Sequence, residues 1–153
     1  MDIIWRSLGG MLAVISFAVI LRVPRRFLLL AGVDGAIGGF TYLLIEKMTG
    51  SVLIATFVGA IVISVIAHIF ARVFKTPVTM FLIPANMTIV PGAGMYRIVY
   101  YILNSDSYLS NFYFKQTFMA AGAIVGAIFI VNTILGNVKL GVHTIKKEIK
   151  KVR

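Results

Sequence analysis

The sequence predicts an all-α integral membrane protein with about five transmembrane helices, the fourth of them broken into two half-helices. The first observation is composition: 59% of the 153 residues are hydrophobic and the mean hydropathy is +0.97, whereas about half of a soluble domain is apolar. The second is a series of apolar runs, each near the roughly 20 residues that cross a bilayer core. The third is a run of prolines and glycines inside one of these apolar stretches, residues 77–103.

Three continuous spans are predicted first, at residues 3–21, 27–45 and 51–71. Lipid gives helices no hydrophobic reason to associate, so close packing in a membrane needs small residues on the facing surfaces. The second, third and fifth predicted spans carry such residues, and some of these faces are expected to meet another chain. They are Gly32, Gly35 and Gly39, then Ala55, Gly59 and Ser64, and finally Gly122, Ala123, Gly126 and Ala127.

The fourth span, residues 78–103, is expected to be discontinuous. Proline removes a backbone donor and glycine loosens a helix, and both occur at Pro91, Gly92 and Gly94. We therefore expect half-helices at 78–90 and 95–103 with a break at 91–94. Irregular backbone at membrane depth is tolerated only where it is buried in protein or lines a watery cavity, and transporters use such half-helices to hold a solute.

A polar and aromatic loop is predicted at residues 104–116, followed by a fifth span at 117–138 and a tail at 139–153. In the tail, Val142, Ile145 and Ile149 follow helical spacing with lysines between them. This pattern predicts a basic amphipathic helix on an anionic inner leaflet. A docking helix for a partner subunit is the alternative.

Basic residues are distributed unevenly over the turns, which predicts the orientation. Cytoplasmic loops are enriched in Lys and Arg, so the N-terminus is expected outside and the C-terminus in the cytoplasm. The net charge of +10 is thus assigned to topology and not to nucleic-acid binding. The basic side holds Arg22, Arg25, Arg26, Arg72, Lys75, Lys139, Lys146, Lys147, Lys150, Lys151 and Arg153, and the other side only Arg6, Lys47 and Lys115.

The composition leaves little for catalysis or cofactor binding. The chain has no cysteine and two histidines, so neither a metal site nor a cofactor is expected. Without a paired carboxylate or a recognisable serine nucleophile, an intramembrane enzyme is not expected either. The N-terminus opposes Arg6 with Asp2 and has no cleavage-site pattern, which argues against a cleaved signal peptide. The chain is interpreted as one domain, residues 1–153.

Asp34 lies near the middle of the second predicted span. A charge at that depth costs about 3 kcal/mol even on the lenient insertion scale. Asp34 is therefore a candidate proton-coupling carboxylate, or a ligand for a cation or a substrate ammonium. A structural role is the alternative, as a protonated acid or as the partner of Arg97. His68 is as often a packing residue as a proton relay, and Glu46 and Lys47, at the end of a span, are assigned to solvent.

Polar residues around the break form the candidate substrate site. Arg97 offers a planar fork of donors that suits a carboxylate, although it could instead pair with Asp34 or reach the outer interface. The N–H groups from Gly92 to Met95 form a partial positive charge that attracts an anion. Three further polar residues near the break have two interpretations. Their side chains could bond to a solute, or they could bond to backbone carbonyls that the kink leaves free. These are Asn86, Thr88 and Tyr96.

The run I-P-A-N-M-T-I-V-P-G-A-G-M-Y-R at residues 83–97 resembles the I-P-x-x-x-P-x-V-P-G-x-x-x-Y signature of the threonine/serine exporter family, in particular its small-subunit (YjjB-type) members. Val23–Pro24–Arg25, the pair Gly32 and Gly35, and Pro77 follow the family's order. The chain departs from the signature at Thr88, where the family has its middle proline, and at Ala85 and Asn86.

The resemblance implies a subunit of a secondary exporter in the bacterial cytoplasmic (inner) membrane. It implies export of amino acids such as threonine and serine, or of dicarboxylates such as succinate. It also implies a larger partner subunit, and thus a hetero-oligomer, since family members occur as one fused chain or as two chains. The alternative is a scaffold subunit that does not transport, whose broken helix only packs against the larger chain.

Overall fold

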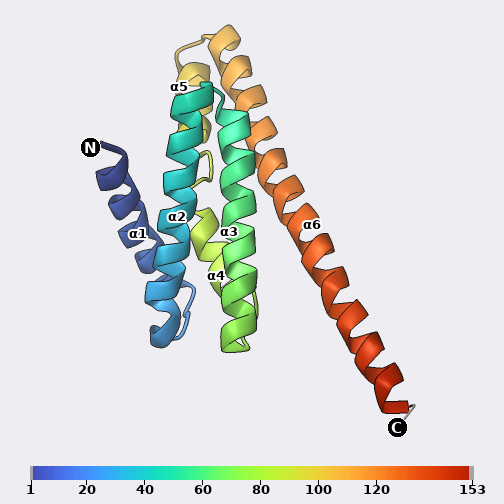
Figure 1. The fold of residues 1–153 in the computed structure, drawn as a ribbon. Coiled ribbons are helices and arrows are strands. Elements are labelled where there is room, and N and C mark those ends of the chain that lie inside the picture. Colours follow the sequence, from blue (N-terminus) through green and yellow to red (C-terminus); the bar gives the residue numbers. More distant parts are fainter. Residues whose placement is uncertain (1, 152–153) are drawn as a thin grey trace.

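The computed structural model describes the backbone of residues 2–151 and the side chains of residues 4–135. Over that part of the chain the structure consists of six helices without a strand (Figure 1). They are α1 (Asp2–Ile20), α2 (Arg25–Thr49), α3 (Val52–Phe74), α4 (Thr79–Asn86), α5 (Gly92–Leu103) and α6 (Ser107–Lys151).

Three of these helices are long and apolar enough to cross a membrane. They are α2, α3 and the described part of α6, residues 107–135, with mean hydropathies of 1.8, 2.6 and 2.2. The described apolar part of α1, Ile4–Ile20, is shorter. The structure therefore confirms an all-α protein with three helices that could cross a membrane, and the number of five crossings stays a prediction.

The interrupted stretch contains two helices whose boundaries differ from the predicted ones. The gap between α4 and α5 lies at residues 87–91, not at 91–94. Proline disfavours the helical conformation of the residue before it and fits the first turn of a helix. Pro91 therefore keeps Val90 out of a helix and is the last residue before α5, and Gly92 and Gly94 lie inside the first turn of that helix. In Figure 1 the chain rises from the end of α3 through α4 and then α5 to the start of α6.

The predicted loop at 104–116 is wrong, because α6 begins at Ser107. Asp106 caps this helix: its Oδ1 accepts a hydrogen bond from the Leu109 N–H at 3.0 Å, and its carbonyl accepts one from the Ser110 N–H at 3.1 Å. An Asp at this position is a strong helix start signal, so the local sequence contained the information. The helix also continues without interruption past residue 138 to Lys151. The side chains of the predicted amphipathic tail lie outside the described residues.

Helices α1 to α4 pack together through glycines and alanines, as the small-residue pattern predicts. Gly32 lies against Ile15 and Gly35 against Val14, which joins α2 to α1. Gly38 lies against Ile63, which joins α2 to α3. At the end of the bundle where the chain enters α2 and leaves α3, four phenylalanine rings pack edge to face at centroid distances of 5.6–6.4 Å. They are Phe27, Phe70, Phe74 and Phe81.

Replacing Gly38 by alanine is expected to destabilise the bundle. A Cβ at this position would overlap the Ile63 side chain, and overpacking of this kind costs about 1–3 kcal/mol. The control is Gly122→Ala on α6, where a Cβ meets no atom within 4 Å and better helix propensity should raise stability slightly. Thermal unfolding in detergent compares the two. An equal melting temperature for both variants would show that α2 and α3 do not approach as closely as described.

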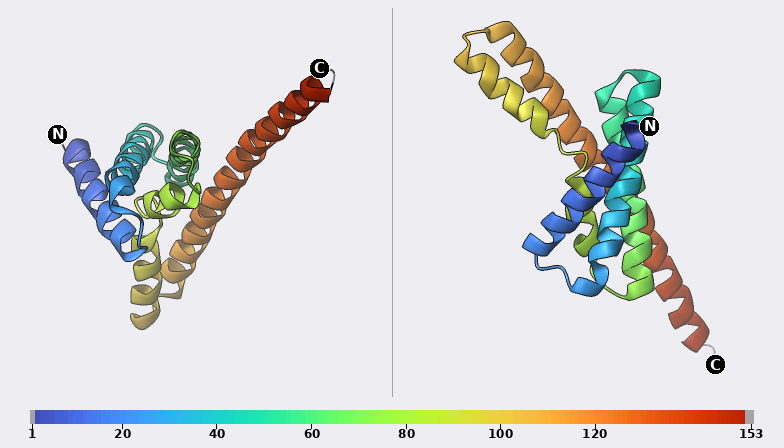
Figure 2. Two further views of the ribbon diagram at one scale, coloured as in Figure 1. Left: turned by 90° about the horizontal axis from the view of Figure 1, so that it is seen from below. Right: turned by 90° about the vertical axis from the view of Figure 1, so that its left-hand side faces the viewer.

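Helix α5 and the first part of α6 form a hairpin that projects from the bundle (Figure 2), whereas α6 also packs against α3. No residue of α5 is buried, and the right-hand view of Figure 2 shows α5 and the first part of α6 projecting away from α2 and α3. The two helices hold each other through aromatic contact, with the Tyr101 and Tyr113 rings stacked at 5.4 Å and 3°. The outer surface of α5 is therefore available to lipid or to another chain.

Candidate functional site

A cavity of about 330 Å³ lies between the two parts of the protein, where α1, α2 and the start of α3 face the α5–α6 hairpin. It follows directly on the interrupted segment, because Pro91 and Gly94 form part of its wall. The other polar residues that line it are Arg6, Tyr42, Glu46, Arg97, Tyr113, Gln116 and Thr117. A cavity of this size, bounded by several helices and by a few convergent polar groups, has the properties of a small-molecule site.

The cavity combines two guanidinium groups with one carboxylate. The Arg97 guanidinium carbon lies 5.1 Å from the centre of the Tyr113 ring, so a cation–π contact holds it against α6. On the opposite wall Tyr42 and Glu46 of α2 line the cavity together with Arg6 of α1. Positive and negative groups therefore face one cavity from different helices.

The beginning of α5 adds backbone donors to this wall. Ala93 and Gly94 line the cavity, and both precede the first helical hydrogen bond of α5, from the Met95 N–H to the Pro91 carbonyl at 3.2 Å. Pro91 has no side chain that could cap the helix. The first N–H groups of a helix lack intrahelical partners and favour negative charge. Together with Arg97, this wall suits a carboxylate.

Gly94 also brings α5 close to α6. A Cβ at this residue would overlap the Thr117 hydroxyl, so only glycine leaves that hydroxyl its present position beside the cavity. By contrast, Gly92 has no atom within 4 Å of its Cβ position and is not part of the cavity wall. Of the two glycines at the break, Gly94 is thus the one at which α5 and α6 approach closely.

The other predicted site residues lie outside this cavity. The Thr88 hydroxyl donates to the Ala85 carbonyl at 2.9 Å, and Thr88 lines a neighbouring cavity of about 400 Å³ that shares Arg6 and Tyr42 with the first. Asn86 is buried and donates to the Leu82 carbonyl at 2.7 Å. Tyr96 is 69% exposed and stacks on Tyr100.

Asp34 is fully buried and does not contact the cavity. Its exposure is 0%, and neither carboxylate oxygen has a hydrogen-bond partner within the part of the chain that the structure describes. The Ser64 hydroxyl and the Asn86 carbonyl oxygen are likewise buried without a partner. The three side chains come from α2, α3 and α4, which pack together. Asp34 and Arg97 thus belong to different environments, and Arg97 contacts Tyr113 instead.

Several cavity residues were not identified from the sequence. Glu46 was assigned to solvent because it lies at a span end, but the structure includes it in the cavity wall with Arg6 and Tyr42. Gln116 was assigned to the end of the predicted loop and Thr117 to the start of the fifth span, whereas both lie within α6. The signal that could have identified these residues is their position. Each is polar, lies one or two turns from the end of a span, and shares a helix face with glycines.

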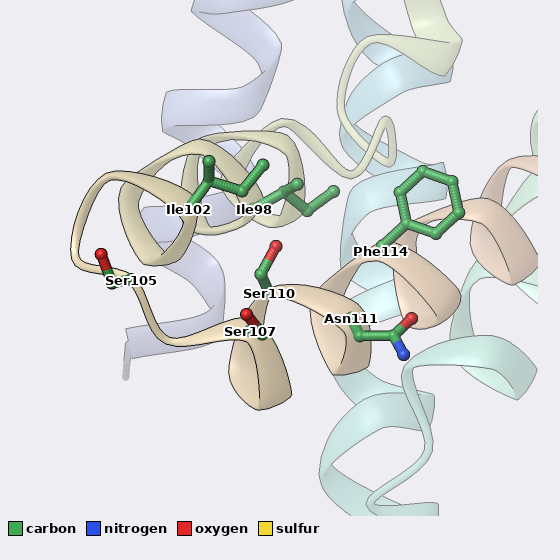
Figure 3. Close-up of a pocket in the computed structure, with 7 residues that line it drawn as sticks. All are labelled: Ile98, Ile102, Ser105, Ser107, Ser110, Asn111 and Phe114. Carbon is green, nitrogen blue, oxygen red and sulfur yellow. The ribbon is translucent and has the colours of Figure 1, made fainter.

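A third cavity, between α5 and the start of α6, differs from the first in chemistry. Figure 3 shows its lining, in which Ile98 and Ile102 face Ser110, with Ser105, Ser107, Asn111 and Phe114 around them. It contains about 320 Å³ and no charged side chain. It therefore lacks the groups that would balance an ionised solute.

Helices long and apolar enough to cross a membrane, arranged around a polar cavity with charges of both signs, define a membrane protein with a candidate solute site. The chain belongs to the threonine/serine exporter family, since the family model described as Threonine/Serine exporter, ThrE, matches residues 6–134. Comparison with curated proteins gave no match, and comparison with solved structures gave none either.

Proposed function

We propose that this chain is the small subunit of a secondary exporter that moves small carboxylate-bearing solutes out of the cytoplasm. The observation that carries the proposal is the cavity lined by Arg97 and by Ala93 and Gly94 of the first turn of α5, together with Arg6 and Glu46. A subunit that served only as a scaffold would fill such a space with apolar side chains. A guanidinium held by an aromatic ring and a helix N-terminus provide the donors that a carboxylate needs.

The presence of Glu46 favours an amino acid such as threonine or serine over a dicarboxylate such as succinate. A zwitterion presents one carboxylate and one ammonium, which matches a cavity with Arg97 on one wall and Glu46, together with Arg6, on the other. A second carboxylate would face Glu46 and be repelled. The nearby hydroxyl and amide of Thr117 and Gln116 offer hydrogen bonds to a hydroxyl on the solute.

Replacing Glu46 by glutamine is expected to change this selectivity. The variant keeps a hydrogen-bonding group beside Tyr42 but loses the negative charge, and one charge-assisted hydrogen bond is worth about 1.5–3 kcal/mol. Efflux of labelled threonine should therefore fall by about tenfold or more, and efflux of succinate should not fall. Lys47→Gln, next to it and not part of the cavity wall, is the control. Equal effects of the two variants on threonine would contradict the role of Glu46.

The proposal includes a larger partner subunit of the same family. The described part of the chain has six helices, three of them long and apolar enough to cross a membrane. They offer little material to enclose a path with two alternating openings. Tyr96 and Leu103 on the outer surface of α5 are 69% and 79% exposed. This exposed surface supports the proposal that the partner subunit packs against α5. A second copy of this chain is an additional possibility for the small-residue faces.

Measuring export in cells with and without the larger subunit tests the whole proposal. Labelled threonine, serine and succinate are loaded, and efflux is followed for cells that contain either chain alone or both chains. The proposal requires efflux of one solute to depend on both chains and on Arg97. Efflux that needs only the larger chain would identify this subunit as a scaffold.

The orientation belongs to the proposal as well. The connections from α1 to α2 and from α3 to α4 lie at the same end of the molecule in Figure 1, and they carry or adjoin Arg22, Arg25, Arg72 and Lys75. We infer that this basic end faces the bacterial cytoplasm. The cavity with Arg97 then opens toward the outer side of the membrane. Asp34, the proton-coupling candidate, lies in the core between this cavity and the basic end.

A further inference from the structure

A larger cavity, of about 660 Å³, lies at the basic end of the molecule, far along α3 from the site described above. It is bounded by the last turns of α3, the connection to α4, and α6. Figure 1 shows why it exists: α6 diverges from α3 toward this end. The two helices therefore form a wedge that narrows toward the middle of the molecule.

The wall of this wedge is cationic. Arg72 and Lys75 both line it, and no Asp or Glu is among its lining residues in the described part of the chain. Arg72 extends across the gap, where its Nη2 donates to the Leu135 carbonyl of α6 at 2.7 Å. A guanidinium has five N–H donors, so this bond fixes the group and leaves other donors for a ligand.

Polar groups without a partner lie in the same wall. The Thr76 hydroxyl is buried and has no hydrogen-bond partner among the described residues. His68 is 9% exposed, and its Nδ1 contacts the Ser64 carbonyl at 2.7 Å, which leaves its second ring nitrogen for the cavity that it lines. The Asn132 side chain lines the opposite wall on α6. A buried polar atom without a partner is costly, so a ligand with several oxygens would satisfy this wall.

The mouth of the wedge opens onto apolar surface. Val78 and Leu135 belong to the wall, and Val73 and Ile134, next to lining residues in the chain, are 66% and 59% exposed. A soluble anion needs only the cationic part of such a cavity. A phospholipid uses both parts, because its phosphate meets the cations and an acyl chain follows the apolar surface between the helices.

We propose that this wedge binds one anionic phospholipid, whose phosphate lies against Arg72 and Lys75 and whose acyl chain lies between α3 and α6. The leaflet at the basic end of a membrane protein is the one rich in anionic lipid, and basic pockets between transmembrane helices bind such headgroups. The bound lipid would hold α6 at its present angle to α3. The proposal does not depend on the transported solute.

Native mass spectrometry of the purified protein in an uncharged detergent tests this inference. Phosphatidylglycerol and phosphatidylcholine with identical acyl chains are added in turn, and the bound fraction of each is titrated. We expect one phosphatidylglycerol to bind at least about tenfold more tightly than phosphatidylcholine. The double variant Arg72→Gln, Lys75→Gln should lose this preference.

The control is the double variant Arg22→Gln, Arg25→Gln, which removes the same charge from the same end of the molecule but leaves the cavity wall intact. It should keep the preference. Because Arg72 also bonds to α6, the single variant Lys75→Gln is measured beside the double variant, and a reduced preference in this variant supports the site even if the double variant does not fold. Equal binding of both lipids, or unchanged preference in Lys75→Gln and the double variant, would overturn the proposal.

A competition experiment distinguishes a lipid from a soluble anion. Glycerol phosphate has the same phosphate chemistry without an acyl chain, so it should not displace phosphatidylglycerol at millimolar concentration. Displacement would show that the wedge is a site for a soluble anion, and the lipid assignment would be wrong.

Discussion

Efflux of the transported solute is expected to fall by about ten- to a hundredfold when Arg97 is replaced by alanine. In the structure Arg97 lies against the Tyr113 ring and is part of the cavity wall beside the first turn of α5. Its loss removes the main cationic partner of a carboxylate and leaves the packing of the bundle unchanged, because α5 has no buried residue. Membrane abundance of the variant should therefore match that of the parent protein.

Two further variants define the role of Arg97. Arg97→Lys keeps the charge but loses the planar fork, so efflux should recover only in part. Lys115→Ala removes a positive charge from the neighbouring helix α6 at a position outside the cavity, and it should leave efflux unchanged. Full activity of Arg97→Ala, or equal losses in Arg97→Ala and Lys115→Ala, would show that the cavity is not the solute site.

Replacing Asp34 by asparagine is expected to reduce efflux by at least about tenfold without lowering stability. Asp34 is fully buried and its oxygens have no partner among the described residues, so no other buried group loses a hydrogen bond when the carboxylate is removed. A buried carboxylate without a partner is unfavourable. The melting temperature of Asp34→Asn in detergent should therefore equal or exceed that of the parent protein.

Ser64→Ala serves as the matched control for Asp34. Ser64 is also fully buried, and its hydroxyl has no partner among the residues that the structure describes, but it cannot carry a charge. If Asp34 acts through ionisation, only Asp34→Asn should lose efflux. A lower melting temperature and lower abundance of Asp34→Asn, in proportion to the lost efflux, would support the structural role instead.

Much of the fold was predictable because the bilayer imposes it locally. Long apolar runs must be helical where lipid offers no hydrogen-bond partner, so the spans that became α1, α2 and α3 were found within a few residues. The interruption before α5 was also predictable in kind, since Pro91 acts on its own backbone and on that of Val90. The exact residues of this interruption were not predictable, because a proline can either break a helix or stand just before the first turn of the next one.

The sequence by itself determined that this is a helical membrane protein, that its chain is interrupted before α5, and that the charge is concentrated in a few turns. Only the tertiary structure decided which polar groups meet. It separated Asp34 from Arg97, placed Arg97 with Arg6 and Glu46 around one cavity, and left Tyr96 on the outside. The physical reason is that these partners lie on helices far apart in the chain, and helix packing, set by contacts such as Gly38 with Ile63, brings them together.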